Sequence, residues 1–165
     1  MWTALESAAE KLAPASGFSE SDRTGDFYDE TDARFGKPVM LTPRLGQGAF
    51  RVAITELYKR QCALTEGKVL PALDAAHIRP YGEGGTQTKS NGILLRKDIH
   101  SVFDAGYATI DSDYRFVVSE KVKEIFNNGN EYRRLHGTKL RLPDKVNDRP
   151  NPEFLRWHND NRYLG

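Results

Sequence analysis

The fold is decided by three short segments: Ala75-Ala-His-Ile-Arg-Pro-Tyr81, Asn91-Gly-Ile-Leu-Leu-Arg96 and Asp98-Ile-His-Ser-Val-Phe-Asp104. The apolar run Leu70–Ile78 predicts a strand, because it stops just before a proline. A second strand is predicted over Gly92–Leu95, after a glycine-rich loop over 81–90. A short helix is predicted over Lys97–Ala105, with Gly106 as the residue that ends it. The central order is therefore strand, loop, strand and helix.

Shorter elements are predicted around this centre. Residues Gln47–Gln61 predict an amphipathic helix, since Phe50, Ile54, Leu57 and Tyr58 recur at helical spacing. Further on, the pattern predicts two strands and two helices, over Tyr107–Ile110, Phe116–Val118, Glu120–Phe126 and Glu153–His158. This mixture predicts a single domain of the α+β class.

Charge divides the chain into two unlike parts. The 165 residues carry 24 Lys and Arg against 23 Asp and Glu, a formal net charge of +1. Residues 1–43 hold eight acids and four bases, whereas the remaining 122 residues hold 20 bases and 15 acids. We expect a partly ordered acidic arm over 1–43 and a catalytic domain over 44–165, whose net charge of +5 suits a polyanionic partner.

Cysteine content and hydropathy exclude several classes. Cys62 is the single cysteine, which excludes an internal disulfide and any structural zinc site that needs a cysteine pair. No apolar run approaches the roughly 20 residues of a membrane span. Glu6 and Glu10 interrupt the first segment where a signal peptide would be apolar. We therefore expect a cytoplasmic protein with no membrane partner.

Four residues of the central segments are candidates for metal binding or catalysis. His100 and Asp104 are four positions apart and share one helix face, so they could hold a divalent cation and leave coordination sites open. His77 comes from the neighbouring strand and could take a proton from an attacking water. Asn91 precedes the second strand. A cation facing a base is what phosphodiester hydrolysis needs.

The order His77, Asn91, His100 resembles the HNH motif of the ββα-metal nucleases. The surrounding segments are similar to the bacterial restriction endonuclease subgroup of that family; beyond the three already quoted they are Arg44-Leu-Gly-Gln-Gly-Ala-Phe-Arg51 and Cys62-Ala-Leu-Thr65. The resemblance covers roughly residues 44–158. It implies a two-stranded antiparallel ribbon packed against a helix, with Mg²⁺ or a similar divalent ion between them.

The resemblance also implies roles for individual residues. The expected catalytic set is His77 as general base, His100 as metal ligand and Asn91 as the residue that fixes the loop. Asp104 is similar to a second helix ligand. Many relatives carry a ligand immediately before the base, where this chain has Ala76. Water could replace that ligand, or Asp74 could reach in as a further metal ligand.

Simpler interpretations stand beside these roles. His77 could be a half-buried strand histidine, and His100 with Asp104 a surface pair of little energetic weight. Asp74 alternates with Ala76 along the strand, which does not ensure that it faces the site. Five basic residues are candidates for nucleic-acid binding, with solvated surface charge as the alternative for each: Arg79, Arg96, Lys89, Arg51 and Arg44. Arg51 could instead brace the motif.

The resemblance implies a divalent-metal-dependent endonuclease that hydrolyses DNA phosphodiester bonds, of restriction or defence type. Two alternatives stay open: a toxin-type nuclease with an immunity partner, and an inactive DNA-binding module, which Ala76 motivates. Cutting both strands favours a homodimer, and members of the subgroup are often joined to a separate DNA-recognition domain. With +5 on the catalytic segment, we expect weak and salt-sensitive DNA binding.

Overall fold

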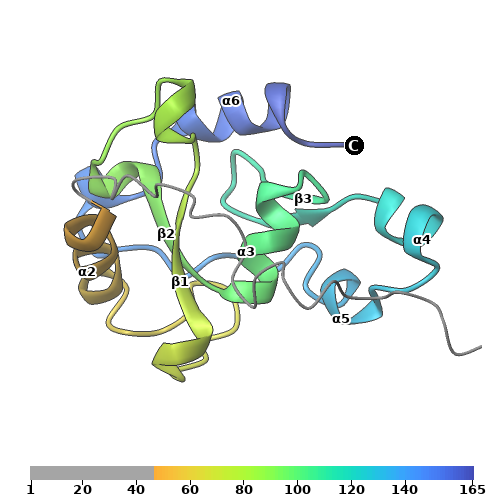
Figure 1. Cartoon of the computed structure of the whole chain (residues 1–165), viewed down its shortest axis with the longest axis horizontal. Helices are drawn as coiled ribbons and strands as arrows, with labels where there is room; N and C mark the ends of the chain where they lie inside the picture. The colour runs from red at the N-terminus through yellow and green to blue at the C-terminus, as the bar shows by residue number, and fades with distance from the viewer. Residues whose placement is uncertain (1–46) are drawn as a thin grey trace, which may run out of the picture. The chain divides into compact units, whose positions relative to one another are not determined.

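The computed structural model describes residues 47–165 (Figure 1). The predicted acidic arm over 1–43 and the candidate DNA contact Arg44 lie outside the described residues. The helices are α2 (Gln47–Leu57), α3 (Lys97–Asp104), α4 (Lys121–Phe126), α5 (Asn130–Arg133) and α6 (Pro152–Asn161). The strands are β1 (Leu73–His77), β2 (Gly92–Arg96), β3 (Ala108–Ile110) and β4 (Phe116–Val118). Among these residues, no helix combines the length and apolar character that a membrane crossing requires.

The centre of the fold is an antiparallel ribbon of β1 and β2, in which His77 pairs with Gly92. Helices α2 and α3 both contact this ribbon. Strand β2 is buried over Gly92–Leu95, which explains why its sequence is apolar without alternation. A Cβ atom at Gly92 would lie 2.4 Å from Ile54 Cδ1 and 2.7 Å from Phe50 Cζ. Glycine at this position therefore lets α2 approach the ribbon closely.

A second, smaller part of the domain begins where α3 ends. Gly106 has a φ of +80°, as predicted for the residue that terminates this helix. Strands β3 and β4 then form a two-stranded antiparallel sheet. Ser119 accepts a hydrogen bond at its Oγ from the backbone N–H of Lys121, 3.2 Å away, at the start of α4. Helix α6 packs against β3 and so closes the domain.

The α+β prediction is confirmed, while most elements differ from the predicted ones by one to four residues at one or both ends. Helix α2 ends at Leu57 rather than Gln61, because Lys59 and Arg60 adopt left-handed backbone conformations, with φ angles of +53° and +58°. Leu70–Ala72, at the start of the predicted first strand, form a 3₁₀ turn instead, and the strand begins at Leu73. The four-residue helix α5 was not predicted, since so short a helix has no readable periodicity.

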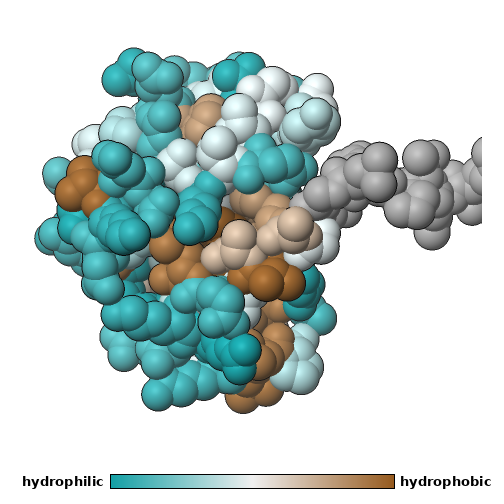
Figure 2. Space-filling view, turned by 90° about the vertical axis from the view of Figure 1, so that its left-hand side faces the viewer, coloured by the Kyte–Doolittle hydropathy of each residue, from teal (hydrophilic) through white to brown (hydrophobic). Residues whose placement is uncertain are grey.

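One apolar core joins these elements. Fully buried members from strand β2 and from helices α2 and α3 include Ile54, Ile93, Leu95, Ile99 and Phe103. Figure 2 shows the face over α2, where hydrophilic residues cover most of the surface and hydrophobic ones gather near its middle. The core fixes β1, β2 and α3 against one another; His77 and His100 come from β1 and α3, and Asn91 from the 3₁₀ turn directly before β2.

Candidate active site

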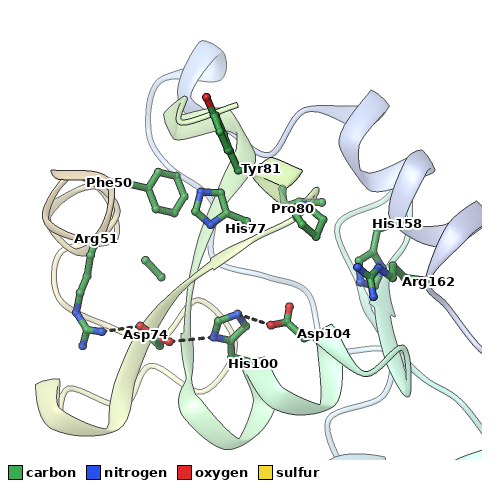
Figure 3. Close-up of a pocket in the computed structure, with 12 residues that line it drawn as sticks. Phe50, Arg51, Asp74, His77, Pro80, Tyr81, His100, Asp104, His158 and Arg162 are labelled. Carbon is green, nitrogen blue, oxygen red and sulfur yellow. Dashed lines mark hydrogen bonds and ion pairs between the residues drawn. The ribbon is translucent and has the colours of Figure 1, made fainter. Parts of the chain in front are cut away.

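The side chains predicted to carry chemistry meet at one cavity of about 450 Å³ (Figure 3). Its lining includes Asp74 and His77 from β1 and His100 and Asp104 from α3. Helix α2 adds Phe50 and Arg51, and the far wall holds Tyr81, His158 and Arg162. The structure therefore brings together His77 and the predicted metal ligands. Asn91 is buried behind the cavity rather than in its lining.

His77 is held at the end of β1 by two contacts. Its ring stacks on Phe50, with centroids 3.8 Å apart and planes inclined by 11°. Its Nε2 atom lies 3.1 Å from Oε1 of Gln87 in the glycine-rich loop. Burial lowers the pKa of His77 from its usual value; the Gln87 contact and Asp104 oppose this shift, while His100 adds to it. The imidazole is therefore neutral at pH 7, as a general base must be.

Asn91 is fully buried, and its side chain makes hydrogen bonds with the backbone at two points of the loop between β1 and β2. Its Nδ2 atom donates to the carbonyls of Arg79, at 2.9 Å, and Thr86, at 2.8 Å. Its Oδ1 atom accepts from the backbone N–H of Arg79, also at 2.9 Å. Three hydrogen bonds satisfy nearly the whole amide, so this side chain acts on the backbone that follows His77.

His100 lies between two carboxylates. Its Nδ1 atom is 3.1 Å from Asp74 Oδ2, and its Nε2 atom is 3.1 Å from Asp104 Oδ2. Burial lowers the pKa of His100, but the hydrogen bonds and charges of Asp104 and Asp74 together outweigh it, and the pKa is raised. The i, i+4 pairing of His100 with Asp104 follows the helical spacing of the sequence.

Asp74 faces the cavity, and both of its carboxylate oxygens are engaged. Oδ1 accepts a hydrogen bond from Arg51 Nη1 at 2.6 Å, and Oδ2 faces His100. Arg51 also donates from Nη2 to the carbonyl of Leu73, 3.0 Å away. Arg51 thus braces the motif from α2. Ala76, which stands where relatives carry a ligand, is fully buried and pairs with Ile93 on β2.

Within residues 47–165, no group of three or more His, Cys, Asp or Glu side chains is placed to hold a metal ion. His100 and Asp104 offer one imidazole and one carboxylate, and the Asp104 side chain is 57% exposed. Mg²⁺ characteristically takes one or two carboxylates from the protein and completes its shell with water and substrate phosphate. One imidazole and one carboxylate therefore fit a divalent ion that takes most of its ligands from water and substrate, without selecting a particular metal.

The basic residues that were candidates for nucleic-acid binding lie in different surroundings. Of the four candidates within residues 47–165, Arg51 alone lines the cavity. Arg79 donates from Nε to the carbonyl of Glu83 at 2.5 Å and lies 5.1 Å from the centre of the Trp157 ring. Arg96 forms a two-point ion pair with Asp98. Lys89 is exposed beside a different, shallow groove.

Sequence reasoning missed Tyr81 and Arg162 of the cavity lining, and it missed Gln87, which lies outside that lining and contacts His77. Arg162 follows α6 and forms an ion pair with Glu83, which brings the chain's end beside the loop after β1. No local pattern could place it there, since 79 residues separate the two partners. His158 donates from Nε2 to the carbonyl of Phe103, 3.2 Å away, and accepts at Nδ1 from Thr109, 2.9 Å away, which gives it a structural role.

Comparisons with known proteins agree with this geometry. The sequence profile of the HNH endonuclease family matches residues 62–111, which include His77, Asn91, His100 and Asp104. A solved structure titled "Modification dependent TagI restriction endonuclease" superposes with a TM-score of 0.53 at 21% sequence identity. The match covers 71% of this chain and 38% of that one, so this chain spans well under half of its length. No curated protein matches the chain significantly.

The family match covers the segments that build the ribbon, the loop and α3, and the similar solved structure shares the fold. Residues 62–111, which carry the motif residues, are therefore similar to the HNH endonuclease family, and the solved structure supports the fold.

Proposed function

We propose that the protein hydrolyses DNA phosphodiester bonds, with His77 as general base and a divalent cation held by His100 and Asp104. One observation carries the proposal: a neutral imidazole and an imidazole–carboxylate pair line the same open cavity (Figure 3). Metal-assisted hydrolysis of a phosphodiester requires both parts.

His77 is suited to take a proton from water. The lowered pKa leaves the ring unprotonated at neutral pH, and the Phe50 stack restricts its rotation. General bases of this kind contribute about 10²- to 10⁴-fold to a rate. The proton that His77 accepts would come from the water that attacks phosphorus, on the side of the cavity nearest β1.

His100 and Asp104 would hold the cation, and Asp74 would orient His100. When bound, the ion would neutralise charge on the scissile phosphate and on the leaving oxygen. Because Asp74 accepts from Nδ1 of His100, Nε2 is left to face the cation beside Asp104. We assign Asp74 a positioning role rather than the ligand role that the sequence allowed, since Arg51 and His100 already engage its two oxygens.

We also propose a restriction or defence role. The solved structure with a similar fold is a modification-dependent restriction endonuclease, and this chain spans 38% of it. Selection of a DNA sequence or modification would then require a recognition domain besides residues 44–165. A homodimer would place two such cavities on the two strands of a duplex.

Cleavage of supercoiled plasmid with Mg²⁺, with Mn²⁺ and with EDTA tests the proposal. We expect cleavage with either ion, none in EDTA, and none by His77→Ala. His136→Ala is the matched control, because this exposed histidine lies outside the cavity lining. Cleavage in EDTA, or equal cleavage by His77→Ala and the wild type, would overturn the assignment.

A further inference from the structure

The glycine-rich loop between β1 and β2 reaches back to the catalytic candidate. Gln87 stands ten residues after His77, and its side-chain oxygen Oε1 lies 3.1 Å from Nε2 of that ring. Nothing in the family motif assigns a role to this residue. Its side chain is exposed, so the contact is not enforced by core packing.

The hydrogen bond to Gln87 favours one tautomer of the neutral His77 ring. An amide oxygen only accepts hydrogen bonds, so the ring must donate from Nε2. A neutral imidazole carries a single N–H, so the proton at Nε2 leaves the Nδ1 lone pair free. That lone pair is what a general base uses. After His77 takes a proton, both ring nitrogens donate, and Gln87 still accepts from Nε2.

Asn91 positions the loop segment that holds Gln87 beside the His77 ring. Asn91 Nδ2 donates to the carbonyl of Thr86, the residue directly before Gln87, over 2.8 Å. The same nitrogen donates to the carbonyl of Arg79 at 2.9 Å. A Cβ atom at Gly85 would lie 1.9 Å from that carbonyl oxygen and 2.9 Å from Asn91 Nδ2, so only glycine allows the loop this close.

We propose that Gln87 is a positioning residue that holds His77 in the Nε2-protonated tautomer, and that Asn91 acts on His77 through the placement of Gln87. The stack on Phe50 fixes the plane of the ring, and Gln87 fixes its direction within that plane. This inference rests on the proposed function of His77 for its catalytic consequence. The tautomer itself follows from the contact alone.

The test compares Gln87→Met, which keeps the side-chain length and removes the acceptor, with Gln87→Glu, which keeps an acceptor. Two-bond ¹H–¹⁵N correlation spectra of the full chain labelled with ¹⁵N-histidine report the tautomer, and His77→Ala assigns the signals. We expect His77 of the wild type and of Gln87→Glu to be protonated at Nε2. In Gln87→Met we expect a mixture of tautomers and about tenfold slower single-turnover plasmid cleavage, a part of what a general base contributes.

Gln61→Met is the matched control, because it makes the same substitution at a glutamine other than the one that contacts His77, and it should leave both spectrum and rate unchanged. A wild-type His77 protonated at Nδ1, or a Gln87→Met spectrum identical to the wild type, would overturn the inference. Undiminished cleavage by His77→Ala would instead reject the proposed function, while the spectra would still decide the tautomer. The two failures are therefore distinguishable.

Discussion

Asp74 on β1 and His100 on α3 are 26 residues apart in sequence, yet Oδ2 of the first lies 3.1 Å from Nδ1 of the second. The other oxygen of Asp74 is held by Arg51 on α2. Three elements thus contribute to one line of contacts that ends at the imidazole. Such a carboxylate–histidine pair fixes which ring nitrogen is free to bind a cation.

Replacing Asp74 by Asn should weaken cation binding without removing a ligand. The amide is neutral, so it no longer stabilises a proton on Nδ1 of His100 as the carboxylate does. We expect the Mg²⁺ concentration for half-maximal cleavage to rise by about 10- to 100-fold. Titration of cleavage rate with Mg²⁺ measures this, and Mn²⁺ binding followed by electron paramagnetic resonance checks it without turnover. Asp113→Asn, on an exposed turn, is the control; identical Mg²⁺ curves for the wild type and Asp74→Asn would contradict the positioning role.

Asn91→Ala should destabilise the fold as well as the site. The side chain is fully buried, and its removal leaves the backbone groups of Arg79 and Thr86 without their partner. An unmet hydrogen-bonding group costs about 1 to 3 kcal/mol when it is buried, and water can reach the exposed Thr86, so we expect the free energy of unfolding to fall by about 2 to 4 kcal/mol. Urea denaturation measures it, with the exposed Asn128→Ala as control. A loss below about 0.5 kcal/mol, the range of ordinary surface substitutions, would show that the loop does not depend on Asn91.

Two glycines of the same loop should respond differently to alanine. At Gly85 a Cβ atom would overlap the carbonyl of Arg79, whereas at Gly82 it would meet nothing within 4 Å. We expect Gly85→Ala to lower the free energy of unfolding by about 2 kcal/mol and to slow cleavage. Gly82→Ala should stay within about 0.5 kcal/mol of the wild type. Equal melting temperatures for the two variants would refute the close approach of the loop to Asn91.

His158 should make stability depend on pH. Burial lowers its pKa to about 4, and the ring is only 2% exposed. Between pH 6.5 and 4 the unfolded chain binds a proton at this residue and the folded chain does not, so stability falls as the pH falls. The shift corresponds to a loss of about 3 kcal/mol over that range. Urea denaturation at pH 7 and at pH 4.5 measures the loss.

A variant that lacks only His158 provides the comparison. His158→Gln should be less stable than the wild type at pH 7, because it loses the stack on Phe103, and the difference should narrow as the pH falls. A difference that stays constant between pH 7 and 4.5 would mean that His158 does not resist protonation in the folded protein.

The ribbon and α3 could be predicted from the sequence because their signals are local. Apolar runs, a proline and a terminal glycine mark the ends of β1, β2 and α3, and the i, i+4 spacing places Asp104 beside His100. The side of β1 on which Asp74 lies could not be predicted. A five-residue strand with two consecutive half-buried positions has no clean alternation, and its contacts depend on α2.

The contacts made by loops and by distant residues were beyond sequence reasoning. Gln87 stands in an exposed loop where nothing in its neighbours indicates contact with His77. Arg79 and Arg96 were candidates for DNA contacts because they flank the motif, but whether an arginine is free depends on side chains such as Trp157 and Asp98 that lie near it. The number of basic residues in a sequence can indicate an anionic partner, but the fold determines which of these residues are free to contact it.

The central claim is that His77 is the base at the cavity where His100 and Asp104 hold the cation. Single-turnover cleavage of plasmid by His77→Gly at saturating Mg²⁺, with and without added imidazole, tests it most directly. We expect a rate at least about 100-fold below the wild type, because a general base is lost, and partial recovery as imidazole enters the vacated space. A His77→Gly enzyme that cleaves within a few-fold of the wild type without imidazole would contradict it.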